Sequence, residues 1–170
     1  MNCKGRIQTG WKGLINEMAE LKQSPIAIGS DHAGYEYKNI LIEWLQDRGY
    51  EVLDCGCYSS NSVDYPDIAK KVCQQINGGQ ASRGILICGT GIGISMAANK
   101  IRGIRAAHCT DCYSAKFTRL HNDANVICFG ARVLGVGVVE ELLEVFLTTE
   151  FEGGRHITRI EKLDQLCDLN

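Results

Sequence analysis

The sequence lacks the charge imbalance that is typical of proteins that bind nucleic acid or an anionic membrane surface. Eighteen Lys and Arg residues stand against 20 Asp and Glu residues, so the 170-residue chain has a formal net charge of −2. It also lacks any long block of like charge, which argues against a disordered or acidic tail. No run approaches the roughly 18 apolar residues of a membrane span, and Met1 to Arg6 contains no apolar signal core. We therefore expect a globular, cytoplasmic protein that binds neither nucleic acid nor membrane.

Internal repeats, low-complexity tracts and Pro/Ser-rich linkers are also absent, so a single domain is expected. The domain is expected at residues 25–152. Residues 153–170 indicate a C-terminal helical arm. Residues 1–24 carry apolar residues at helical spacing and form an N-terminal extension, either an added helix or a segment introduced by cloning.

The chain contains nine cysteines, an odd number, and is long enough to fold without disulfides. Several of them lie inside apolar runs, where a cysteine acts as a small hydrophobic residue. We therefore expect reduced thiols, and the question is whether any one of them is reactive.

Short apolar runs that indicate strands alternate with stretches whose apolar residues recur at helical spacing. Strands are expected at 26–29, 51–54, 84–88, 104–107 and 125–129. Helices are expected at about 37–45, 66–76, 92–100, 114–120 and 139–146. This alternation predicts an α/β fold with a doubly wound, five-stranded parallel sheet, Rossmann-like or flavodoxin-like, in three α-β-α layers.

In a doubly wound fold, ligands bind beyond the carboxyl ends of the strands. At such an end, Cys88-Gly-Thr-Gly-Ile-Gly-Ile-Ser95 joins a buried strand to a helix. Backbone N–H groups at a helix start can bind an anion, although a tight turn that needs small residues would give the same pattern. It is not a Walker loop, because no Gly-Lys-Ser/Thr follows, and its glycines do not have the dinucleotide-binding spacing.

Cys88, the last residue of the third predicted strand, is the candidate reactive thiol. A helix N-terminus stabilises a thiolate that faces it. The alternative is a core cysteine that ends an apolar strand. Thr90 is close in sequence, and Asp31 and His32 end the first strand, which favours a chemical role because strands one and three flank the switch point.

Two kinds of basic side chain could serve a substrate at these strand ends. His32 and His121 lie next to predicted strands, and histidine titrates near neutral pH. Arg132 follows the fifth strand, where a phosphate would bind. Arg155 and Arg159 are four residues apart and share a helix face, so they form either a phosphate clamp or a solvated face paired with Glu161 or Asp164.

Two cysteine pairs raise further alternatives. Cys109 and Cys112 lie between a strand and a helix, as a thioredoxin-type pair would. Cys55 and Cys57 could be imagined in a zinc site with His108. Neither spacing is specific, so we expect incidental thiols and no metal.

Six ordered motifs together resemble ribose-5-phosphate isomerase type B, the family that also includes the galactose- and allose-6-phosphate isomerases. The resemblance runs from about Pro25 to Leu166 and leaves residues 1–24 uncovered. The motifs are Gly29-Ser-Asp-His-Ala-Gly34, Asp64-Tyr-Pro66, Gly84 to Lys100, His121-Asn-Asp-Ala-Asn125, Phe129-Gly-Ala-Arg132 and Gly153-Gly-Arg-His-Ile-Thr-Arg159.

The resemblance implies an aldose–ketose isomerase without metal or cofactor, which works as a homodimer or a dimer of dimers on a sugar phosphate. It implies that Cys88 is the base that moves a proton between C1 and C2 of the open-chain sugar. Thr90 and the backbone of the loop would hold the enediolate oxygen; the glycines of this loop are Gly89, Gly91 and Gly93.

The resemblance also assigns the remaining site residues. Asp31 and His121 would open the sugar ring, with Asn122 and Tyr65 as nearby polar contacts. The phosphate-binding positions are His32, Arg132, Arg155 and Arg159. In this family the C-terminal arginines serve the neighbouring subunit, so the site would be shared.

The expected reaction interconverts ribose 5-phosphate and ribulose 5-phosphate, a step of the pentose phosphate pathway. It needs a base that works near neutral pH and donors for the developing oxyanion. The alternatives are a galactose- or allose-6-phosphate isomerase, a non-catalytic module that binds sugar phosphates or nucleotides, and a thiol oxidoreductase that uses Cys109 and Cys112.

Overall fold

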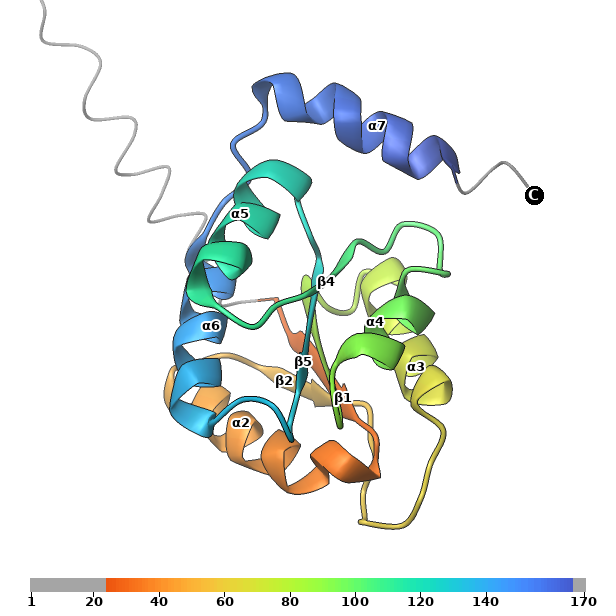
Figure 1. The fold of residues 1–170 in the computed structure, drawn as a ribbon, viewed down its shortest axis with the longest axis vertical. Coiled ribbons are helices and arrows are strands. Elements are labelled where there is room, and N and C mark those ends of the chain that lie inside the picture. Colours follow the sequence, from red (N-terminus) through yellow and green to blue (C-terminus); the bar gives the residue numbers. More distant parts are fainter. Residues whose placement is uncertain (1–23, 167–170) are drawn as a thin grey trace, which may run out of the picture.

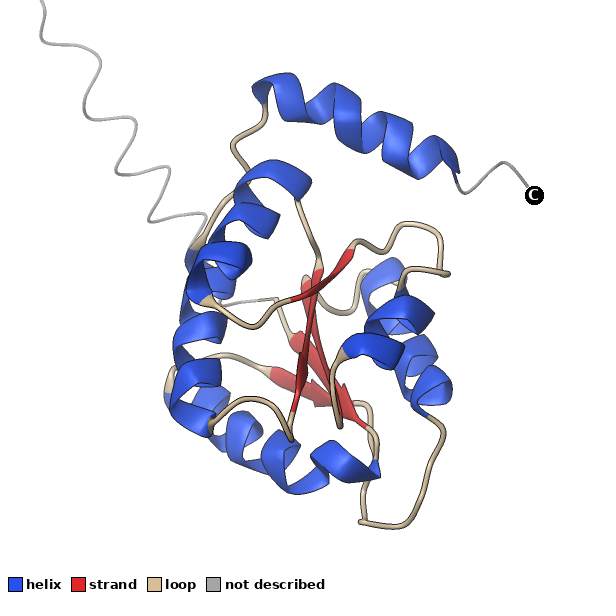
Figure 2. Ribbon diagram, viewed as in Figure 1, coloured by secondary structure: helices blue, strands red, loops and turns tan. Residues whose placement is uncertain are grey.

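The computed structural model describes residues 24–166, which form a five-stranded, all-parallel sheet with helices on both faces (Figures 1 and 2). The strands are β1 (Ile26–Ser30), β2 (Val52–Asp54), β3 (Arg83–Cys88), β4 (Ala106–His108) and β5 (Val126–Gly130). The predicted α/β fold class is confirmed. The expected N-terminal extension lies, except for its last residue, outside the described residues.

The strand order is β2-β1-β3-β5-β4. The expected adjacency of β1 and β3 is confirmed, but the flavodoxin-like order would place β4 next to β3, and β5 lies there instead. Burial explains the exchange, because all five residues of β5 are buried, whereas none of the three residues of β4 is. The longer and more apolar strand takes the central position, and the short strand forms the edge.

Helices α2 (Tyr35–Asp47), α5 (Cys112–Asn122) and α6 (Val136–Thr148) cover one face, and α3 (Tyr65–Asn77) and α4 (Ile92–Ala98) cover the other (Figure 2). The alternation of side chains along β3 assigns its residues to these layers. Ile85 and Ile87 pack with the first layer, and Leu86 and Cys88 pack with the second. The Cys88 side chain is therefore on the α3–α4 side.

Helix starts and ends agree with the local sequence. Pro66 lies in the first turn of α3, where its missing N–H costs no hydrogen bond. The carboxylate of Asp111 caps α5 by accepting a hydrogen bond from the N–H of Ser114 at 2.7 Å. The fourth strand starts two residues later than predicted, because the N–H of Arg105 donates to the side chain of Asn125 rather than to a ladder.

The C-terminal arm consists of a 3₁₀ turn (Gly154–His156) and α7 (Ile157–Gln165). Figure 1 shows α7 beyond the end of α5, at the opposite end of the sheet from the start of α2. No residue of α7 is buried. Among residues 24–166, no helix is long and apolar enough to cross a membrane.

Candidate active site

Three of the predicted site segments meet at one edge of the sheet. In the parallel register, Ser30 of β1 pairs with Ile87 of β3, and Cys88 pairs with Gly130 of β5. The backbone N–H of Asp31 continues this alignment by donating to the carbonyl of Ile87 at 3.0 Å. The ends of β1, β3 and β5 therefore form a common edge, as the topology rule for parallel sheets predicts.

The sulfur of Cys88 lies at the centre of this edge. The side chain is 5% exposed, and its Sγ accepts a hydrogen bond from the backbone N–H of Gly91 at 3.0 Å. The sulfur is therefore the acceptor of a hydrogen bond from the start of the loop. The loop that follows thus folds back to place a backbone dipole against the candidate base.

Gly91 is required by the shape of this loop. Its φ is +81°, in the region that L side chains rarely adopt. A Cβ atom there would lie 2.6 Å from the backbone of Phe129. The loop therefore presses against β5 so closely that only a glycine fits.

Arg132 is hydrogen-bonded to the same loop through its backbone, and its side chain lies near the loop. Its N–H donates to the carbonyl of Gly89 at 3.1 Å, and the N–H of Ala131 donates to the carbonyl of Cys88 at 2.9 Å. A Cβ at Gly89 would lie 3.5 Å from Nη1 of Arg132, so the guanidinium lies against the loop. A positive charge against this loop suits a site for an anionic substrate.

Asp31 and His32 lie at the end of β1 with defined orientations. Oδ1 of Asp31 accepts hydrogen bonds from the N–H groups of Ala33 and Gly34, which holds the 7% exposed carboxylate in place. Nδ1 of His32 accepts a hydrogen bond from the N–H of Val63 at 3.4 Å. In the neutral ring this contact leaves the proton on Nε2, which can then donate to a ligand.

Tyr65 and Thr90 complete this cluster. A Cβ at Gly93 would lie 2.9 Å from the ring of Tyr65 and 3.2 Å from its hydroxyl oxygen, so the phenol covers the first turn of α4. Oγ1 of Thr90 accepts a weak hydrogen bond from the N–H of Ile92 at 3.4 Å. The structure thus brings together these predicted site residues: Asp31, His32, Tyr65, Cys88, Gly89, Thr90, Gly91, Gly93 and Arg132.

The other four predicted site residues lie at the opposite edge of the sheet. Helix α5 runs antiparallel to the strands, so His121 and Asn122 at its end lie near the start of β5. The arm with Arg155 and Arg159 begins at the same edge, where the N–H of Glu152 donates to the carbonyl of Leu120. A five-residue strand spans roughly 17 Å. Within one protomer, His121 therefore reaches neither the candidate base nor Asp31, so their expected shared role in ring opening requires two copies of the chain.

At this far edge, His121 belongs to a small polar cluster. Its ring stacks on that of His156 with centroids 4.2 Å apart, and its Nε2 lies 3.5 Å from a carboxylate oxygen of Glu152. Burial, followed by the neighbouring His121, lowers the pKa of His156, whose Nε2 is buried and has no hydrogen-bond partner among the described residues. We therefore expect a neutral His156 beside His121.

Glu152, His121 and His156 are also a conceivable metal cluster, because their ligand atoms lie within 4.8 Å of one another. The two imidazole planes differ by only 10°, however. The lone pairs of the two Nε2 atoms lie in these nearly parallel planes and do not converge on one ion. In this arrangement the cluster does not form a metal centre.

The described cysteines other than Cys88 give little support to redox or zinc chemistry. Cys109 is 1% exposed, and burial raises the pKa of its thiol to about 12, which suppresses the thiolate that a dithiol exchange needs. Burial also raises the pKa of Cys55 to about 11. The hydroxyl of Ser30 and the carbonyl of Ser59 are hydrogen-bond partners of the Cys57 sulfur.

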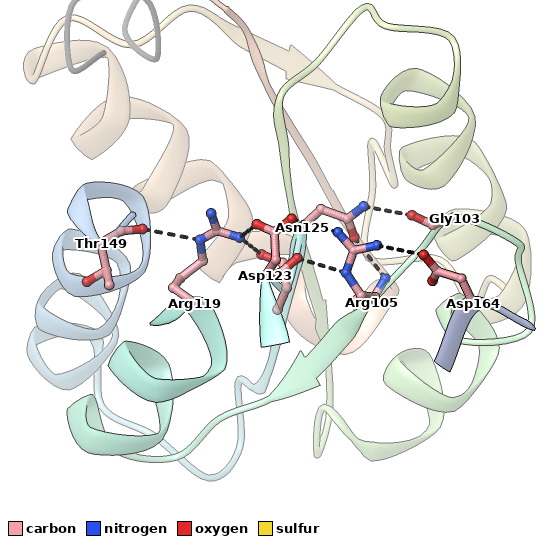
Figure 3. A network of polar contacts seen from close by, with 8 residues as sticks. Gly103, Arg105, Arg119, Asp123, Asn125, Thr149 and Asp164 are labelled. Atoms are coloured by element: carbon pink, nitrogen blue, oxygen red, sulfur yellow. Dashed lines mark hydrogen bonds and ion pairs between the residues drawn. The ribbon is translucent and has the colours of Figure 1, made fainter. Parts of the chain in front are cut away.

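Ion pairs join α5, the start of β4 and the arm (Figure 3). Asp123 accepts from Arg119 at 2.8 Å and from Arg105 at 2.9 Å, and Arg105 also lies 3.6 Å from Asp164 of α7. Arg119 is 2% exposed. Because Asp164 pairs with Arg105, it is not the partner of the two arm arginines, which form no ion pair with a residue in 24–166.

One contact of the loop involves a residue that sequence reasoning considered only as a zinc ligand. Nε2 of His108 lies 3.0 Å from the carbonyl oxygen of Thr90. The position of His108 at a strand end was the available signal. Its contact with the loop reaches across β5, whereas the expected order would have placed β4 directly beside β3.

Comparison with known proteins agrees with this geometry. Residues 26–163 match the family model described as ribose/galactose isomerase. The chain is 47% identical over 138 residues to ribose-5-phosphate isomerase B of Escherichia coli, covering 81% of this chain and 93% of that protein. It is 44% identical over 142 residues to D-erythrulose-4-phosphate isomerase of Pectobacterium atrosepticum, covering 81% and 91%.

A solved structure of ribose-5-phosphate isomerase B from Clostridium thermocellum superposes with a TM-score of 0.83 at 49% identity, covering 84% of this chain and 96% of that one. The family match spans most of the chain, and the relatives are covered over nearly their whole length. This chain belongs to the ribose/galactose isomerase family and is an isomerase.

Proposed function

We propose that this protein interconverts ribose 5-phosphate and ribulose 5-phosphate through an enediolate, with Cys88 as the base. The observation that carries the proposal is the hydrogen bond from the N–H of Gly91 to Sγ of Cys88 at 3.0 Å, on a loop that also holds Arg132. It combines a stabilised thiolate, backbone donors and a cation for a substrate phosphate at one edge of the sheet.

The proposed chemical step moves one proton along the carbon chain. The Cys88 thiolate removes the proton from C2 of the open-chain aldose, and the electron pair of that bond forms the C1–C2 double bond of the enediolate. The developing negative charge on the C1 oxygen is stabilised by the loop N–H groups and by Thr90. The thiol then returns the proton to C1, and the hydroxyl proton on the C2 oxygen passes to the C1 oxygen, which yields the ketose.

Ring opening and phosphate binding are assigned to two copies of the chain. Asp31 and His32 act from the protomer that supplies Cys88, whereas His121, Asn122 and the arm arginines act from the second copy. Two observations support this division: the two groups lie at opposite edges of one sheet, and α7 exposes apolar side chains. These are Ile157 and Leu163, and Leu166 directly after the helix is exposed as well.

In the shared site, His32 and Arg132 of one protomer hold the substrate phosphate together with Arg155 and Arg159 of the other. Phosphate held far from C1 and C2 keeps the reacting carbons at the sulfur. Arg155 and Arg159 are both exposed and free of ion pairs within residues 24–166, as a clamp that awaits an anion requires. We accordingly propose a homodimer or a dimer of dimers.

A substrate panel tests the proposal. Ribose 5-phosphate should give the highest kcat/KM among ribose 5-phosphate, allose 6-phosphate, galactose 6-phosphate and D-erythrulose 4-phosphate. The four-carbon compound is included because one relative of this chain is a D-erythrulose-4-phosphate isomerase. If another sugar phosphate gave the highest kcat/KM, that compound would replace ribose 5-phosphate as the proposed substrate, and the isomerase mechanism would stand. Binding without exchange of the C2 proton in deuterated water would indicate a non-catalytic module.

A further inference from the structure

His108 lies beside the loop of Cys88, although the proposed mechanism gives it no part. It is the last residue of β4, and its register partner is Cys128 of β5. Its Nε2 lies 3.0 Å from the carbonyl oxygen of Thr90. A carbonyl oxygen only accepts hydrogen bonds, so this ring nitrogen carries the proton and donates.

The carbonyl that His108 contacts belongs to the same peptide unit as the N–H that contacts the sulfur. The oxygen of the Thr90–Gly91 peptide accepts a hydrogen bond from His108, and its N–H donates one to Sγ of Cys88. Both donor–acceptor distances are 3.0 Å. Hydrogen bonds that share an amide polarise it in the same sense, so a donor at the oxygen strengthens donation by the N–H.

The His108 ring and β5 also restrict the orientation of this peptide. A Cβ at Gly91 would lie 2.7 Å from Cδ2 of His108, and a Cβ at Gly130 would lie 2.6 Å from the carbonyl carbon of Thr90. Glycines in a loop readily permit a peptide to rotate. In the rotated form the Thr90 oxygen would point toward the sulfur and oppose the thiolate, and the bond from His108 disfavours that form.

We infer that His108 is a positioning residue, which holds the Thr90–Gly91 peptide with its N–H directed at Cys88 and thereby increases the reactivity of the thiolate. The inference rests on the proposed function only where it concerns turnover. Its effect on the sulfur itself can be measured without any substrate.

Two substitutions separate the hydrogen bond from packing. His108→Gln retains a donor nitrogen at nearly the same distance from the backbone, whereas His108→Leu has similar bulk and no donor. Asp31, Tyr65, Arg132 and Cys128 are the other ionisable groups next to Cys88 or its loop, and they are identical in both variants.

The experiment alkylates each protein with iodoacetamide over a range of pH and follows the Cys88 peptide by mass spectrometry. We expect His108→Leu to move the midpoint of this profile to higher pH and to slow alkylation at neutral pH about fivefold, the effect of roughly one hydrogen bond. In steady state, kcat should fall by a similar factor while KM changes less than twofold. His108→Gln should retain most of the wild-type reactivity and kcat.

Equal thermal midpoints of the two variants exclude a folding defect as the cause. If His108→Leu alkylates and turns over like the wild type, or if His108→Gln fails as badly as His108→Leu, the positioning role is wrong. Turnover by a Cys88→Ser variant would instead overturn the base assignment. The alkylation profiles would still decide whether His108 acts on the sulfur.

Discussion

Cys88 and His121 lie at opposite edges of one parallel sheet. Cys88 ends β3 at the carboxyl edge, and His121 lies at the end of α5, immediately before β5 starts at the amino edge. A strand of this length keeps them roughly 17 Å apart. If both residues act on one substrate, as proposed above, they must come from different copies of the chain.

Mixing two inactive variants tests this arrangement. Cys88→Ser and His121→Asn should each be inactive alone. After co-refolding in equal amounts, random dimers should recover about a quarter of wild-type activity, because each mixed dimer has one intact site. The measurement is isomerase activity as a function of mixing ratio. A mixture that stays inactive, although mass spectrometry shows mixed dimers, would mean that both residues act within one chain.

Cys88→Ser should lower kcat by about 10² to 10⁴, the usual contribution of a positioned acid–base group. The hydroxyl is a far poorer base at neutral pH, whereas phosphate binding is retained. Isothermal titration with ribose 5-phosphate measures the binding, and the loss of the C2 deuterium label measures proton removal. Cys112→Ser is the matched control, because that half-buried thiol lies outside the site, and it should be fully active.

The central part of the site could be predicted from sequence because it depends on local signals. An apolar run that ends in Cys88 and is followed by closely spaced glycines specifies a buried strand and a tight loop, and the parallel topology places Asp31 at the same edge. The strand order was harder to predict. It depends on the competition of β4 and β5 for the position next to β3, which is decided by packing of the whole sheet.

The separation of His121 from Asp31 was, in contrast, readable from sequence. A helix that leads into a parallel strand ends at the amino edge, so a residue just before β5 cannot lie beside a residue just after β1 of the same chain. The contact between His108 and Thr90 could not be predicted, because it joins an edge strand to a loop across β5. Such contacts require the strand order and the side-chain direction together.

Gly91→Ala should destabilise the fold by about 3 kcal/mol or more, since an L residue is strained at positive φ and its Cβ meets backbone. The relevant values are a φ of +81° and a 2.6 Å approach to Phe129. Gly137→Ala is the control, because nothing lies within 4 Å of its Cβ position and it lies inside α6, where alanine is the better helix former, so stability should not fall. Urea unfolding measures both, and equal midpoints would contradict the prediction.

The buried ion pair of Lys38 and Asp54 should respond asymmetrically to mutation. Lys38 is fully buried, whereas the Asp54 side chain is 31% exposed. Asp54→Asn leaves an uncompensated ammonium in the interior and should cost about 2 kcal/mol or more. Lys38→Met removes the buried charge and leaves a carboxylate that water can reach, so it should cost less. Urea unfolding of both variants checks the order, and the reverse order would show that water reaches Lys38.

Stability should fall as pH drops below about 6.5, the ordinary histidine pKa, in part because of His156. Burial, His121 and then Arg155 lower the pKa of His156 in the folded state, although Glu152 opposes them. At a pH between the folded and the unfolded pKa of His156, the unfolded chain binds a proton that the folded chain excludes. The contribution of neutral His156 to stability is therefore fully present above the unfolded pKa and is lost as the pH falls through the folded pKa.

The measurement is the change in thermal midpoint between pH 7.5 and pH 5.5, taken without ligand. His156→Gln should reduce this change, because it removes one group whose protonation favours unfolding. The wild type, measured in the same buffers, provides the reference change. If His156→Gln shows the full wild-type loss at pH 5.5, protonation of His156 does not contribute to acid destabilisation, and the stacked pair with His121 accommodates a charge.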